Sequence, residues 1–197
     1  PGSWRLTEAE EAMLATVTRH FARTIVVLNV GSVFDTSFYS TLEPKAYMYA
    51  LPYEWYEKYG IRRYGFHGAS LEYLSTWTAR KMGREDLKLV CCHLGGSGSL
   101  CAVKNGISID TTMGMGLQCG VLQNNRIGDM DPYIIFPLVE ECGMELNEVK
   151  TMLQTKSGLK GMSGGVSNDL RDIQEAAKNG NGIVIFAKQL LQENYPS

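Results

Sequence analysis

The feature that most constrains the fold is the stretch 87–110, which reads LKLVCCHLGGSGSLCAVKNGISID. Three short apolar runs in it have the length of β-strands: 87–92, 100–103 and 107–109. Asn105-Gly106 separates the second run from the third, and Asn-Gly is the strongest short-range signal for a β-hairpin. We therefore expect an antiparallel meander over these residues.

The first turn of this meander, residues 93–99, is rich in glycine and serine. Glycines let backbone N–H groups converge on an anion, and serine hydroxyls add further donors. The turn is not a Walker A loop, because no Lys-Ser/Thr follows the glycines, and it is not a dinucleotide fingerprint, because a strand follows instead of a helix. The sequence predicts a phosphate-binding hairpin, with a flexible exposed loop as the alternative. Its candidate residues are His93, Gly95, Gly96, Ser97, Gly98 and Ser99.

Composition narrows the class of protein. A chain of 197 residues can hold one good-sized domain or two small ones, and a net charge of −2 argues against nucleic acid or an anionic membrane as partner. We see neither a membrane-spanning run nor a signal peptide. Five cysteines without a C-x-x-C pair suggest reduced thiols and a cytoplasmic protein. We expect Cys91, Cys92 and Cys101 to act as small core residues of the meander.

Periodicity predicts helices on either side of the meander, and hence an α/β fold. We expect a helix over 6–23, a buried strand over 24–30 that ends in a turn at Gly31-Ser32, and two short helices over 43–59 separated by Pro52. Further helices are predicted over 71–82, 133–142, 147–153 and 167–178, with Ser167 as the cap of the last. The stretches 111–132 and 156–166 are predicted to be a long loop and a flexible connection.

Three side chains outside the meander are candidates for chemistry. Asp35 is a lone carboxylate in an apolar, hydroxyl-rich stretch, so it either meets a cation, a metal or N–H groups, or it serves a turn or cap. His67 lies between Gly65 and Gly68, where backbone can approach a ligand closely, although a lone histidine is more often structural. Arg126 can bind a phosphate or carboxylate bidentately. Its alternative is a surface ion pair with Asp129 or Asp131.

Five segments in collinear order carry a resemblance to a known family. They are VFDTSF, YALPYEWYEKYGIRRYGFHGAS, HLGGSGSLCAVKNGISIDTTMG, NNRIGDMDP and KSGLKGMSGGVSNDLRDIQEAA. Over residues 33–177 the chain resembles the acetate/propionate kinases (acetokinases) of the sugar kinase, Hsp70 and actin superfamily. The resemblance implies a mixed sheet with an antiparallel β-meander and flanking helices, as an incomplete actin-like, ribonuclease-H-like ATPase lobe.

The resemblance also implies a reaction and roles for residues. In this family ATP phosphorylates a short carboxylate, such as acetate or propionate, to an acyl phosphate, with Mg²⁺ required. Asp35 matches an aspartate that serves the metal and catalysis, His67 a histidine that contacts the transferring phosphoryl group, and Arg126 an arginine that stabilises its charge. Residues 93–99 match the phosphate loop, and Asn29 matches a first phosphate-contacting asparagine. The resemblance also implies a homodimer.

The chain also departs from the family pattern. Gly96-Ser97-Gly98 replaces Asn-Gly-Ser, Leu71 replaces a second histidine, and Asn124-Asn125 replaces Gly-Thr, which leaves the carboxylic acid open. Family members are longer, so the chain resembles a truncated kinase. We divide it into 1–32, which also resembles a segment of family 3 β-glucosidases, an acetokinase-like lobe over 33–178, and a tail over 179–197. The alternatives to a kinase are a non-catalytic phosphate- or nucleotide-binding remnant and a structural or interaction module.

Overall fold

The computed structural model describes residues 31–184 and, nearer the N-terminus, residues 8, 12, 15, 16 and 19. These five residues are helical, in agreement with the helix predicted over 6–23. The strand predicted over 24–30, including Asn29, lies outside the described residues, as does the tail from residue 185 onward.

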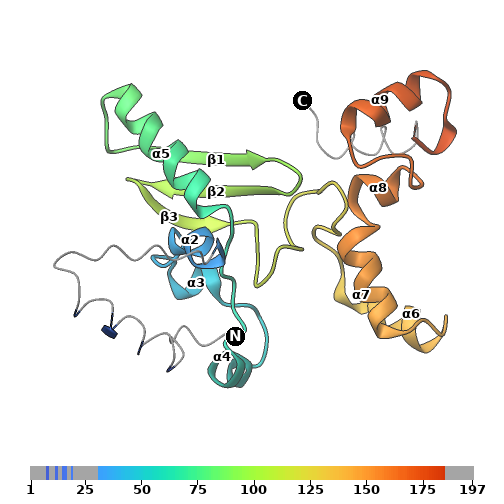
Figure 1. The fold of residues 1–197 in the computed structure, drawn as a ribbon, viewed down its shortest axis with the longest axis horizontal. Coiled ribbons are helices and arrows are strands. Elements are labelled where there is room, and N and C mark those ends of the chain that lie inside the picture. Colours follow the sequence, from blue (N-terminus) through green and yellow to red (C-terminus); the bar gives the residue numbers. More distant parts are fainter. Residues whose placement is uncertain (1–7, 9–11, 13–14, 17–18, 20–30, 185–197) are drawn as a thin grey trace.

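The predicted meander forms the centre of the fold (Figure 1). Its strands, β1 (Lys88–Leu94), β2 (Gly98–Lys104) and β3 (Ile107–Thr111), pair antiparallel in the order β1-β2-β3. Asn105 and Gly106 have φ values of 53° and 76°, as a two-residue type I′ hairpin turn requires. The first turn is shorter than predicted. Because His93 pairs with Ser99 and Leu94 with Gly98, its tip is reduced to residues 95–97.

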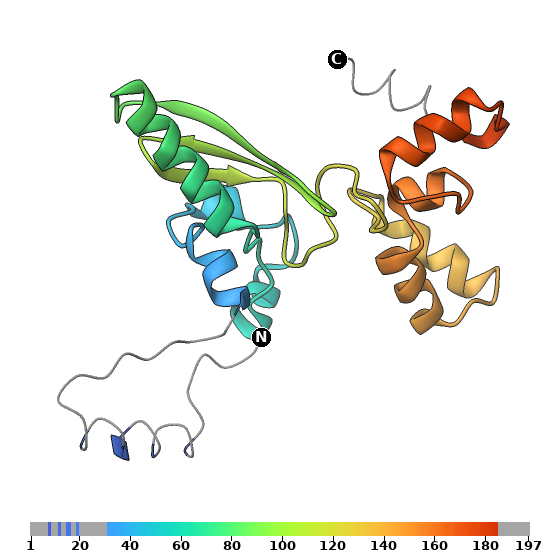
Figure 2. The same cartoon turned by 45° about the horizontal axis from the view of Figure 1, so that its top comes forward.

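The two faces of the sheet differ in their surroundings. Helix α5 (Gly68–Met82) covers one face (Figure 2), and side chains that alternate toward it build the core. This core cluster comprises Phe38, Tyr39, Leu42, Leu71, Cys91, Cys101 and Val103. Cys91 and Cys101 are buried as predicted, but Cys92 is exposed, because the alternation turns it to the opposite face.

Three short helices precede α5 in the chain: α2 (Gly31–Ser37), α3 (Pro44–Tyr47) and α4 (Tyr53–Tyr59). Helix α2 packs against α5, and α3 packs against β3. The predicted break at Pro52 is confirmed, since Pro52 caps α4. The turn predicted at Gly31-Ser32 is wrong, because α2 begins there. Tertiary packing explains the difference: the backbone of α2 lies directly against α5, and a Cβ on Gly68 would be 2.5 Å from the carbonyl oxygen of Asp35.

The second half of the chain is helical and lies beside the sheet, beyond the irregular segment 112–131 (Figures 1 and 2). It consists of η1 (Pro132–Ile134), α6 (Ile135–Glu140), α7 (Leu146–Thr155), α8 (Gly158–Met162) and α9 (Leu170–Lys178). Asp169, and not Ser167 as predicted, caps α9 by accepting a hydrogen bond of 2.8 Å from the N–H of Arg171. The Ser167 hydroxyl instead donates to Asp172.

The stretch 156–166 is ordered, contrary to the flexible connection predicted for it. It contains α8, whose first N–H groups are bound by the loop that carries Arg126: Leu159 N–H donates to the Gln123 carbonyl and Lys160 N–H to that of Asn124, both at 2.9 Å. Glycine makes this close approach possible. Gly158 has a φ of 61°, and a Cβ there would contact the Gln123 carbonyl oxygen.

The predicted α/β fold with an antiparallel meander and flanking helices is confirmed, and the strand pairs in the described part of the chain are all antiparallel. Among the described residues, no helix has the length and apolar character needed to cross a bilayer.

Candidate phosphate-binding site

His67 occupies a constrained position immediately before α5. Its φ of 62° lies in the left-handed region, which non-glycine residues rarely adopt and which often marks functional positions. The predicted close approach of a ligand at the glycines on either side of it is wrong, because both glycines pack against protein. A Cβ on Gly65 would be 2.5 Å from the Tyr39 ring, and one on Gly68 would meet the backbone of Asp35. Both contacts fix the direction in which the His67 side chain leaves the backbone.

The imidazole rings of His67 and His93 stack at the first hairpin, with centroids 4.0 Å apart and planes inclined by 20°. Three serine hydroxyls hold the pair. Ser99 Oγ is 2.9 Å from Nδ1 of His67, and Ser97 Oγ is 3.0 Å from its Nε2. Ser70 Oγ is 3.0 Å from Nδ1 of His93. The hairpin predicted to bind phosphate thus joins directly to the predicted histidine.

Burial and charge favour the neutral form of His67. Desolvation is the largest cause that lowers its pKa, and electrostatic interactions with His93 and Arg126 lower it further. The Asp35 carboxylate acts in the opposite direction. Asp35, His93 and Arg126 therefore all lie close enough to His67 to affect its charge.

The loop that carries Arg126 is tied to the tip of the same hairpin. The N–H of Asn124 donates to the Gly96 carbonyl at 3.4 Å, and an ideal Cβ on Gly98 would lie 2.8 Å from Val121 Cγ2. The alternative of a surface ion pair is not observed. Asp129 accepts a hydrogen bond from Gly120 N–H, Asp131 accepts one from Tyr133 N–H, and no ion pair found among the described residues involves Arg126.

The structure thus gathers most of the predicted site residues around one hairpin: Asp35, His67, His93, Gly95, Gly96, Ser97, Gly98, Ser99 and Arg126. Asn29 lies outside the described residues. Ser70 was missed by the sequence analysis, because nothing in its local sequence indicates that it binds a histidine of β1. The combination of neutral imidazole, small-residue tip and guanidinium is suited to an anion with several oxygen atoms.

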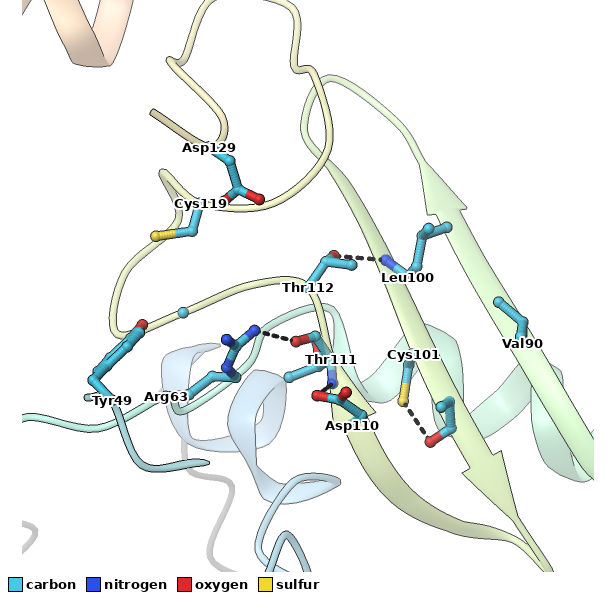
Figure 3. Close-up of a pocket in the computed structure, with 12 residues that line it drawn as sticks. Tyr49, Arg63, Val90, Leu100, Cys101, Asp110, Thr111, Thr112, Cys119 and Asp129 are labelled. Carbon is cyan, nitrogen blue, oxygen red and sulfur yellow. Dashed lines mark hydrogen bonds between the residues drawn. The ribbon is translucent and has the colours of Figure 1, made fainter. Parts of the chain in front are cut away.

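Apart from this hairpin, a cavity lies against the other face of the sheet, next to Val90, Leu100 and Ala102 (Figure 3). It is a cavity of about 400 Å³ that none of the predicted phosphate-binding residues lines. Arg63 lies in it and donates from Nη1 to the Thr111 carbonyl at 2.5 Å, while its buried Nε has no partner. No role for Arg63 was predicted from the sequence.

Solved structures define the class of fold. The chain superposes on an acetate kinase of Porphyromonas gingivalis with a TM-score of 0.73 and 39% identity, covering 78% of this chain and 39% of that one. A propionate kinase of Francisella tularensis gives a TM-score of 0.73 and 35% identity with the same coverage. The fold is therefore part of the actin-like ATPase fold of these kinases.

Sequence comparison identifies the family. The model of the acetokinase family matches residues 9–193, and the chain belongs to this family. It is 47% identical to the acetate kinase of Halothermothrix orenii over 163 residues, which are 82% of this chain and 41% of that protein. It is 52% identical to the acetate kinase of Dictyoglomus thermophilum over 151 residues, or 76% and 38%. The chain thus spans about 40% of the length of these relatives.

Proposed function

We propose that this chain takes part in an acetate-kinase-type phosphoryl transfer, in which ATP and a short carboxylate such as acetate or propionate give an acyl phosphate and ADP. The observation that carries the proposal is the junction at the first hairpin. There the stacked histidines, the tip 95–97 and the Arg126 loop are joined by hydrogen bonds of 2.9 to 3.4 Å. These are the residues that match the phosphate-handling motifs of the family.

The proposed roles follow from the charge of the transferring group. Phosphoryl transfer needs positioning and neutralisation of charge on the equatorial oxygens more than covalent help from the protein. Arg126 supplies a planar, permanently charged donor for two oxygens at once. His67, held neutral by burial, donates one hydrogen bond without adding a charge that would repel Arg126. The glycine-serine tip lets the phosphates approach the backbone closely.

Asp35 is the proposed carboxylate for Mg²⁺. Mg²⁺ commonly takes one or two carboxylates and completes its coordination with water and substrate phosphates, so one half-buried aspartate beside His67 fits this ion. A closed all-protein site does not fit, because the described residues contain no cluster of three or more histidine, cysteine or acidic side chains suited to a metal. Bound there, Mg²⁺ would neutralise charge on the phosphates.

The test is formation of acyl phosphate, trapped as the hydroxamate, with acetate, propionate and butyrate as acceptors. Arg126→Ala should lower turnover by about 10³-fold or more, as for other arginines that stabilise transferring phosphoryl groups. Arg126→Lys should lose less, because it keeps the charge but not the fork. Arg80→Ala removes an exposed arginine of α5 and should leave turnover unchanged. Full activity of Arg126→Ala would remove Arg126 from the mechanism.

The alternative is a non-catalytic role, in which the chain binds phosphate or a nucleotide without turnover. The chain spans about 40% of the length of its relatives. Calorimetric titration with ATP and Mg²⁺ separates the two functions. Binding without turnover selects a phosphate- or nucleotide-binding role.

The proposal also includes a homodimer, which sedimentation of the same samples tests. It further includes a cytoplasmic location, which the five free thiols support.

A further inference from the structure

Both ring nitrogens of His67 are held by serine hydroxyls of the first hairpin, Nδ1 by Ser99 at 2.9 Å and Nε2 by Ser97 at 3.0 Å. A neutral imidazole carries one N–H donor and one acceptor nitrogen, whereas a hydroxyl can play either part. One serine must therefore donate to the ring while the other accepts from it. The choice between them decides which nitrogen of His67 carries the proton.

Burial of the two serines decides this choice. Ser99 is fully buried, and among the described residues its hydroxyl has no hydrogen-bond partner other than Nδ1. If Nδ1 carried the proton, the Ser99 hydroxyl proton would be buried without an acceptor, which is costly. Ser97 is only half-buried at the hairpin tip, where water can accept its proton. Ser99 therefore donates to Nδ1, and Nε2–H donates to Ser97.

We infer that Ser99 is a positioning residue that fixes His67 as the Nε2–H tautomer, and that Ser97 Oγ accepts the hydrogen bond that a phosphoryl oxygen takes over on binding. The second half of this inference rests on the proposed function. The first half depends on the geometry of the apoprotein alone.

The arrangement has a physical advantage for binding an anion. The Nε2–H donor has Ser97 Oγ as its acceptor before phosphate binds. Phosphate therefore replaces one hydrogen bond of this donor by another, and the donor is never left unpaired. A half-exposed serine changes rotamer within nanoseconds, so Ser97 can leave quickly and turn its own hydroxyl toward a second oxygen. The charged or titratable groups that act on the ring are His93, Asp35 and Arg126, and an Nε2–H donor lets His67 join Arg126 without a second positive charge.

The tautomer can be read from the nitrogen chemical shifts of isotope-labelled histidine in the full 197-residue chain, in phosphate-free buffer near neutral pH. His67→Asn assigns the His67 signals, because asparagine tolerates the left-handed backbone. We expect Nε2 protonated and Nδ1 unprotonated in the unsubstituted chain, and a marked loss of this preference in Ser99→Ala. Ser108→Ala is the matched control: Ser108 is equally buried in the neighbouring strand, but its hydroxyl contacts Cys101.

Two results of this experiment would overturn the positioning role of Ser99. One is an Nδ1–H tautomer in the unsubstituted chain. The other is an unchanged tautomer in folded Ser99→Ala. An equal shift in Ser108→Ala would also count against it, because the effect would then come from general loosening of the sheet.

The role of Ser97 is tested with inorganic phosphate as the probe. In Ser97→Ala, which keeps the ring in place, the Nε2–H proton should exchange with water and its resonance should be lost, then return when phosphate is added. Protection of this proton in Ser97→Ala without phosphate, or no recovery while phosphate binds, would overturn the inference for Ser97. If calorimetry shows no phosphate binding to the unsubstituted chain, the role of Ser97 fails together with the proposed function. The tautomer assignment is then still decided by the phosphate-free spectra.

Discussion

Replacing Gly158 by alanine tests how the Arg126 loop is held. Gly158 begins α8 with a φ of 61°, and its Cα faces the backbone of the loop. A Cβ would contact the Gln123 carbonyl oxygen and lie 2.7 Å from that of Arg126. Since both contacts are with backbone, no side chain can rotate away to relieve them, and α8 and the loop must separate.

The cost follows from the hydrogen bonds that separation breaks. Three of them cross the junction: Ser157 N–H to the Asn125 carbonyl at 3.1 Å, and those of Leu159 and Lys160 to the Gln123 and Asn124 carbonyls at 2.9 Å. At about 1 kcal/mol each, their loss amounts to about 3 kcal/mol. The left-handed backbone alone would cost alanine about 1 kcal/mol.

Hydrogen exchange measures this effect residue by residue. In Gly158→Ala we expect the amides of Leu159 and Lys160 to exchange about 100-fold faster, which corresponds to a loss of about 3 kcal/mol in local opening free energy. Gly143→Ala is the matched control, because Gly143 has a similar φ of 68° and no heavy atom within 4 Å of its ideal Cβ. Equal protection of these amides in both variants would refute the argument that α8 holds the loop.

Three further predictions concern stability and reactivity. Leu71→Ala should lower the free energy of unfolding by about 2–5 kcal/mol in denaturant titrations, because Leu71 is fully buried in the core cluster. The pKa of His67 is lowered from its ordinary 6.5, so the unfolded chain binds the proton more readily than the folded one. The free energy of unfolding is therefore retained above about pH 6.5 and falls as the pH drops below it. In thermal melts, the melting temperature of His67→Asn should fall less with decreasing pH. Burial raises the pKa of Cys101 to about 11, so alkylation followed by mass spectrometry should label exposed Cys92 and Cys142 well before Cys101.

The meander and the helices near it could be predicted because their signals are local. The three apolar runs, the Asn105-Gly106 turn and the helical periodicity over 71–82 each act over a few neighbouring residues, and all three appear in the structure. The predicted site also gathers around one hairpin, although the functional roles of its residues stay predictions.

What the sequence did not predict depends on contacts between distant segments. The glycine-serine stretch 156–166 has the composition of a flexible connection, but the loop at residues 123–125 orders it through three backbone hydrogen bonds. The stacking of His67 on His93 joins residues that no local pattern relates, and α2 replaces a predicted turn because it packs on α5. In each case tertiary packing overrides the local preference of the chain.

His93 pairs with Ser99 across the three-residue tip, and this register constrains the number of residues in the tip as well as their identity. Side chains at neighbouring positions of a strand point in opposite directions. A one-residue slip of β2 would therefore turn Ser99 away from the imidazole of His67. Insertions and deletions in the tip should therefore be rejected, even where Ser97 and Ser99 themselves are kept. In a library of hairpin variants selected for function, we therefore expect the three-residue length of the tip to be retained.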